Sequence, residues 1–162
     1  MRVSKVLGLF LLGGLAGCEA TNPRVVTTLN QDASKVSGFP GAAMHGRVIT
    51  SWIDKSASTM STLYGNDVAV NYARKNSDAA YPAGSQLSLV TWKETEDPRW
   101  FGGNIPAKVV SVEQVSVDAS PEKKYAYTRY EGEPAKGVES VAAATPSARA
   151  AFLLGQRAAV MP

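Results

Sequence analysis

The chain of 162 residues contains a single cysteine, Cys18, and a single histidine, His45. One cysteine cannot form a disulfide within the chain, and this pair supplies too few ligands for a four-coordinate zinc site of Cys and His. A Ser–His–Asp triad would depend on His45, and no serine stands in a nucleophile-elbow pattern. The sequence therefore gives no support to the common hydrolase or zinc chemistries.

A strong charge of one sign is also absent, since 17 basic residues stand against 14 acidic ones. The charges are dispersed, with no basic stripe and no basic residues interleaved with aromatic ones, so nucleic-acid binding is not expected. No glycine-rich phosphate loop follows a strand. Three acidic residues, Glu94, Glu96 and Asp97, stand close together, and we expect them in a solvated loop rather than in a metal or catalytic site.

Long hydrophobic runs are missing as well, because the apolar segment Val6 to Leu15 is only about ten residues long and too short to span a bilayer. The basic residues Arg2 and Lys5 precede this segment, and small residues separate it from Cys18. This three-part pattern predicts that residues 1–17 are a signal peptide.

The cysteine at the expected cleavage point resembles the lipobox of bacterial lipoproteins. The resemblance implies acylation of Cys18, cleavage before it, and attachment to the membrane by lipid. The alternative is that Cys18 is an ordinary residue in a secretory signal. By similarity to bacterial sorting signals, Glu19 favours the outer membrane, facing the periplasm. Loss of Arg2 and Lys5 with the signal would leave 15 basic against 14 acidic residues.

The segment from residue 18 to residue 40 is polar, with few large side chains, and is predicted to be a flexible tether. Residues 41–162 are enough for one domain with one core. Alternation of apolar and polar side chains predicts five strands, at 47–53, 59–64, 86–92, 108–117 and 125–130. Helices are predicted at 67–76, capped by Asn66, and at 147–160, capped by Thr145 with Pro146 as the first helical position. The expected fold is α+β, mainly antiparallel sheet with about two helices.

Two groups of residues are candidates for ligand binding. His45 follows Met44 in a glycine-rich segment and is a candidate axial haem ligand, although a lone histidine is more often a plain polar residue. The aromatic candidates for a pocket wall, which can equally pack a core, are Trp52, Tyr64, Trp92, Trp100 and Phe101.

Four segments together resemble the cytochrome P-460 family over roughly residues 48–132. They are TMSTLYGNDVAV (59–70), YPAG (81–84), QLSLVTWK (86–93) and NIPAKVVSVEQV (104–115). The resemblance implies a periplasmic haem fold of mostly antiparallel sheet, often dimeric. It also implies relatives that oxidise hydroxylamine or bind nitric oxide.

Members of that family attach haem through a Cys-x-x-Cys-His motif near the C-terminus, and the type member adds a lysine crosslink to the porphyrin. Here residues 141–162 contain neither Cys nor His, and Ser61 stands at the position of the crosslinking lysine. No covalent haem and no metal site are therefore expected.

Three hypotheses follow for the function. The preferred one is an envelope lipoprotein that keeps the family fold for a non-catalytic binding or structural role. The alternative is a periplasmic protein with non-covalent haem, acting as an oxidoreductase or gas binder. The third is a surface that binds another envelope protein.

Overall fold

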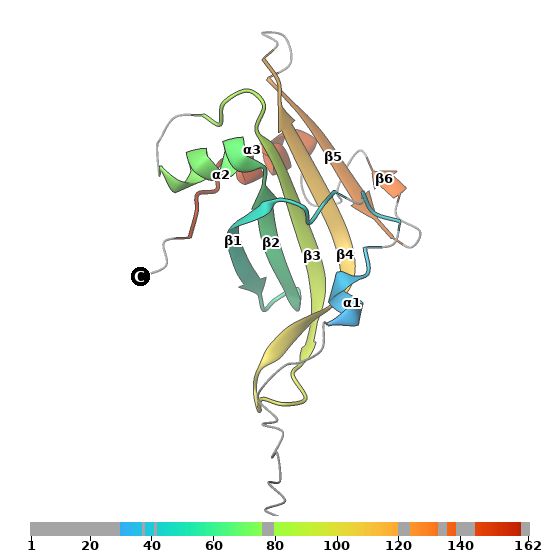
Figure 1. Cartoon of the computed structure of the whole chain (residues 1–162). Helices are drawn as coiled ribbons and strands as arrows, with labels where there is room; N and C mark the ends of the chain where they lie inside the picture. The colour runs from blue at the N-terminus through green and yellow to red at the C-terminus, as the bar shows by residue number, and fades with distance from the viewer. Residues whose placement is uncertain are drawn as a thin grey trace, which may run out of the picture.

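The computed structural model describes residues 30–36, 38–40, 42–75, 80–119, 124–132, 136–138 and 145–159. It shows an α+β fold in which one antiparallel sheet has its strands in chain order (Figure 1). The strands are β1 (Arg47–Asp54), β2 (Thr59–Gly65), β3 (Gln86–Glu96), β4 (Asn104–Val117), β5 (Tyr125–Glu131) and the short edge strand β6 (Lys136–Val138). The helices are α1 (Gln31–Ser34), α2 (Asp67–Arg74) and α3 (Pro146–Leu154). The predicted α+β class and antiparallel sheet are confirmed.

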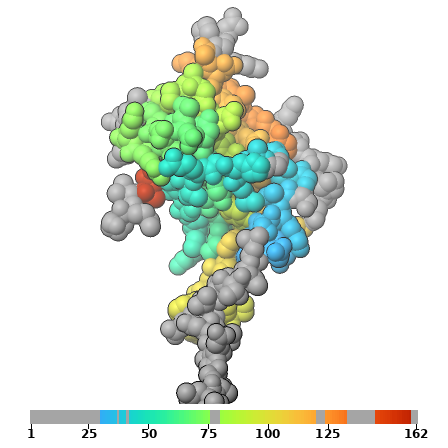
Figure 2. All heavy atoms as spheres, in the orientation of Figure 1, coloured from blue at the N-terminus to red at the C-terminus, as the bar shows by residue number. Residues whose placement is uncertain are grey.

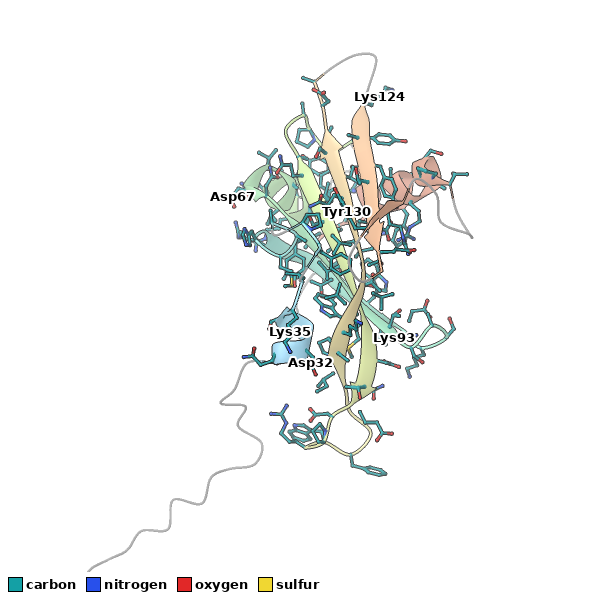
Figure 3. All side chains as sticks on the ribbon, turned by 90° about the vertical axis from the view of Figure 1, so that its right-hand side faces the viewer. Asp32, Lys35, Asp67, Lys93, Lys124 and Tyr130 are labelled. Carbon is teal, nitrogen blue, oxygen red and sulfur yellow. The ribbon has the colours of Figure 1, made fainter. Side chains whose placement is uncertain are left out.

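The β3–β4 hairpin is longer than the rest of the sheet. Strand β2 pairs with β3 only as far as Lys93, and β5 pairs with β4 only from Ser111 onward. From Glu94 and Pro106 to its turn, the hairpin is therefore a two-stranded arm. Figure 3 shows this arm continuing beyond Lys93, away from the body of the domain.

The sheet is covered on both faces, by α1 on one side and α3 on the other (Figure 3). On the side of α3, here the α3 face, Leu63, Leu89 and Leu153 belong to one buried cluster that also includes residues of α2. On the opposite side, here the α1 face, Val90, Trp92 and Val112 form a second buried cluster. Because side chains alternate between faces along a strand, neighbouring residues of β3 contribute to different cores.

Both predicted helices are present, and both predicted caps are confirmed. Asn66 Oδ1 accepts a hydrogen bond from the Ala69 N–H at 3.0 Å, and Thr145 Oγ1 accepts one from the Ala148 N–H at 3.2 Å. The buried residues of α2 include Ala69, Val70 and Tyr72, whereas Val68 is exposed.

The C-terminal helix was predicted to continue to residue 160, which is wrong, because α3 ends at Leu154. Gly155 caps the helix, and the chain beyond it finds backbone partners elsewhere. The Ala158 N–H donates to the Ala73 carbonyl at 3.2 Å, and the Ala159 N–H donates to the Ile49 carbonyl at 3.0 Å. These bonds replace the helical turns and attach the segment to α2 and β1.

The largest difference from the sequence prediction lies in the segment expected to be a tether. Residues 30–36 carry the helix α1, capped by Asn30, and α1 contacts β4. The described residues 30–36 of the predicted tether thus lie against the sheet. Figure 2 shows α1 in blue lying against the body of the domain.

Candidate functional site

A large apolar cavity, broadly open to solvent, lies on the α1 face of the sheet, between α1 and strands β1 to β4. Its volume is about 710 Å³, within the range typical of small-molecule sites. The residues that line it are Asn30, Ala33, Ser34, Met44, Ser51, Trp52, Ile53, Met60, Ser61, Thr62, Tyr64, Trp92 and Pro106. None of these side chains carries a charge at neutral pH, so the described wall suits a neutral, apolar ligand.

Helix α1 forms one wall of this cavity and is held there by two hydrogen bonds. The indole N–H of Trp92 donates to the Ala33 carbonyl at 2.9 Å, and the Asn30 amide donates to the Pro106 carbonyl at 2.8 Å. A buried indole N–H needs such a partner. Trp92 therefore both packs the core and fixes the position of α1.

The structure brings three of the five predicted aromatic residues to this cavity. Trp52, Tyr64 and Trp92 are among its lining residues. The Trp52 ring, however, packs with the cluster on the α3 face, edge-on against Phe152 of α3, with the ring centroids 5.8 Å apart. The other two predicted residues, Trp100 and Phe101, lie in the β3–β4 turn and are exposed.

The candidate haem ligand His45 is exposed and lies outside the apolar cavity. It lines a separate hollow of about 180 Å³, which it shares with Tyr64. Tyr64 borders both spaces, and burial raises the pKa of its phenol against the opposing hydrogen bond with Thr62. The Tyr64 hydroxyl therefore stays protonated at neutral pH.

A second cavity, of about 420 Å³, lies on the α3 face and is more polar. Its base includes Glu113 of β4, whose side chain is 1% exposed. Arg149 of α3 donates to both oxygens of this carboxylate, from Nη2 at 2.7 Å and from Nε at 2.9 Å. Arg129 Nη1 donates at 2.9 Å and the Tyr127 hydroxyl at 2.7 Å, both from β5. We call these four residues the Glu113 cluster.

Both carboxylate oxygens of Glu113 accept hydrogen bonds within the Glu113 cluster. Burial opposes ionisation of Glu113, but hydrogen bonds from Arg149 and Tyr127, with the positive charges of Arg149 and Arg129, outweigh it and lower the pKa. Burial and the bond to Glu113 raise the pKa of Tyr127 to about 12. Neither group can exchange a proton readily near neutral pH, so the cluster is poorly suited to acid–base catalysis.

Stability should fall in acid because of Glu113. Its folded-state pKa lies below the ordinary value of 4.5, so the stabilisation is fully present above that value. It is lost as the pH drops below 4.5 through the lower folded pKa. We expect the gap in unfolding free energy between the wild type and Glu113→Gln to be constant above pH 4.5 and to narrow below it. Urea unfolding at several pH values measures this gap, and a gap that widened in acid would contradict the assignment.

Sequence reasoning did not find the Glu113 cluster. The one available signal of a buried charge is that Glu113 lies on the same face of its strand as Val115. Glu113 also pairs with Leu89 of β3. Its partners come from another strand and from a helix 36 residues away. Such a pairing becomes visible only when the fold is known.

The remaining predicted positions lie apart from both cavities or outside the described residues. Glu94 and Glu96 are strand residues of β3 rather than loop residues, and Asp97 follows them in the turn. Across the residues that the structure describes, no three His, Cys, Asp or Glu side chains are grouped to hold a metal ion. Cys18 lies outside the described residues.

Within the described ranges, no helix has both the length and the hydropathy needed to cross a bilayer. A comparison with models of known protein families finds no match to this chain. A search of curated protein sequences also finds no match.

Proposed function

We propose that this protein is an envelope lipoprotein, attached through acylated Cys18, whose cytochrome P-460-like domain binds a neutral, apolar ligand without transforming it. The observation that carries the binding role is the 710 Å³ cavity on the α1 face, whose described lining has no charged side chain. Compartment and anchoring rest on the N-terminal sequence pattern.

The absence of catalysis is supported by the chemistry of both cavities. The apolar cavity offers hydroxyls, thioethers and indoles, but no group that titrates near neutral pH. The other cavity holds Glu113 ionised and fully bonded. A general acid or base needs a pKa near the operating pH, and the described residues of these two cavities supply none.

The proposal is tested by a charge placed in the cavity wall. Met60 lines the cavity and is half-buried, so Met60→Asp would bring a carboxylate against a bound apolar molecule. We expect at least about a tenfold loss of affinity for a neutral fluorescent probe such as N-phenyl-1-naphthylamine, since burying an unpaired charge costs more than 1.4 kcal/mol. The measurement is a fluorescence titration of the full chain carrying Cys18→Ser, which avoids detergent.

The matched control is Met60→Leu, which keeps the wall apolar and should bind the probe as the wild type does. Thermal unfolding of each variant establishes that it is folded at the assay temperature. A wild-type protein that does not bind the probe, or equal binding by both variants, would contradict the proposal.

A second candidate function is non-covalent haem binding in the same cavity. Met44, Met60 and Tyr64 line it, and methionine and tyrosine both serve as axial ligands in haem proteins. Bound haem would supply redox or gas-binding chemistry at this wall. Haem titration followed by absorption spectroscopy tests the idea. A Soret band at one haem per chain, lost in a Met44→Leu/Met60→Leu double variant, would favour haem over a colourless ligand.

A further inference from the structure

The end of the β3–β4 arm is an ordered turn that presents two aromatic side chains. Within residues 97–103, the Asp97 N–H donates to the Gly103 carbonyl at 2.8 Å, and the Gly103 N–H donates to the Trp100 carbonyl at 2.9 Å. Gly102 adopts a φ of +73°, which glycine accommodates without strain. These bonds give the turn a defined shape.

This turn exposes apolar surface that the rest of the domain does not cover. Phe101 is fully exposed and Trp100 is 49% exposed. The nearest charges are partly balanced, because Asp97 Oδ1 lies 3.3 Å from Arg99 Nε. An exposed Trp-Phe pair on a projecting turn forms an apolar patch of the kind that contacts membranes or other proteins. We call residues 97–103 the aromatic tip.

The aromatic tip lies at the same end of the domain as the point where the N-terminal segment joins it. The Asn30 amide donates to the carbonyl of Pro106, two residues into β4 from its start at Asn104. At about 3.3 Å per strand residue, that point is about 7 Å along the arm from the first residue of β4. Eleven residues separate Asn30 from Cys18, and the twelve steps between them span at most about 43 Å.

We infer that the aromatic tip inserts Phe101 and Trp100 into the interfacial region of the bilayer that anchors the protein. This inference rests on the proposed acylation of Cys18. Aromatic side chains favour the boundary between headgroups and acyl chains, and Trp is enriched there. One lipid anchor leaves a domain free to rotate, whereas a second contact at the tip fixes its orientation. The contact is apolar, so neutral phospholipid suffices.

The test places an environment-sensitive label at the tip of the acylated full chain. With the Cys18 thiol consumed by acylation, Phe101→Cys supplies a free thiol for a nitrobenzoxadiazole label. The protein is reconstituted into phosphatidylcholine vesicles, with Val68→Cys as the matched control. Val68 is exposed on α2. Helix α2 follows the end of β2, which pairs with the start of β3. Val68 therefore lies at the end of the domain opposite the arm. We expect a blue shift and increased emission at position 101, with no change at position 68.

The possible outcomes distinguish a failure of the lipid anchor from a failure of the aromatic tip to insert. If the unmodified chain itself takes up the thiol label, or does not float with the vesicles, the anchor is wrong. If the protein floats but the label at 101 responds no more than the label at 68, insertion of the tip is overturned. A blue shift at position 101 in the non-acylated Cys18→Ser chain, measured without vesicles or detergent, would indicate a second copy of the chain at the tip, which also overturns it. Tryptophan quenching by brominated lipid, lost in Trp100→Phe, gives an independent readout without a label.

Discussion

Replacing Glu113 by glutamine is expected to lower the free energy of unfolding by about 3–5 kcal/mol, the usual cost of removing one partner from a buried ion pair. The carboxylate is 1% exposed and accepts hydrogen bonds from Arg149, Arg129 and Tyr127. A neutral amide leaves two guanidinium groups without their shared counter-charge and presents an N–H₂ to groups that are all donors. Urea unfolding, followed by circular dichroism at neutral pH, measures the loss.

The matched control is Glu131→Gln, at the other carboxylate bound by Arg129. The Glu131 side chain is 39% exposed and water can replace its contacts, so we expect a change of about 1 kcal/mol or less. If Glu113→Gln lowered the free energy of unfolding no more than this control does, the Glu113 cluster would contribute no more to stability than a surface ion pair. The bonds from Arg149 of α3 to Glu113 would then contribute little to holding α3 on the sheet.

The second large effect is expected from Cys18→Ser, which should move the protein from the membrane fraction to the soluble fraction. A serine hydroxyl is not the thiol that the lipobox pathway acylates, so several acyl chains would be lost together. At about 0.8 kcal/mol per buried methylene, that loss removes essentially all of the anchoring energy. Fractionation of cells labelled with radioactive palmitate measures both effects in one experiment.

The control for this experiment is Glu19→Asp, which alters the neighbouring residue and leaves the thiol in place. We expect Glu19→Asp to remain acylated and membrane-bound but to shift from the outer toward the inner membrane, by similarity to bacterial sorting signals. Palmitate in the Cys18→Ser protein would contradict the lipobox interpretation.

The sequence predicted the strands and helices best where local chemistry decides them. Alternating side chains located β2 to within one residue, and Asn66 and Thr145 marked the starts of α2 and α3. The distal part of the β3–β4 arm was missed because Glu94 and Glu96 break the apolar alternation. In this two-stranded arm, whose side chains beyond Lys93 are exposed or half-buried, backbone pairing does not require that alternation.

The candidate sites were less predictable, because their geometry depends on contacts between distant segments. Trp52, Tyr64 and Trp92 were singled out as aromatic, but that they share a cavity follows from the register of β1 to β3 and from the position of α1. Helix α1 has four residues and no buried residue of its own. It depends on the Asn30 cap and on the Trp92 indole, 59 residues away, so no local pattern predicts it.

The order of the elements along the chain has a consequence for biogenesis. Strands β1 to β6 pair in the order in which they are synthesised, so a polypeptide emerging N-terminus first can add each strand to an existing edge. Helix α3, which supplies Leu153 and Arg149 to the α3 face, is the last element to emerge. Glu113 therefore meets Arg149 only after all six strands and α3 have been synthesised. A chain that ended before residue 145 would lack α3, and the leucine-lined sheet face that Leu153 covers would be open to chaperones and proteases.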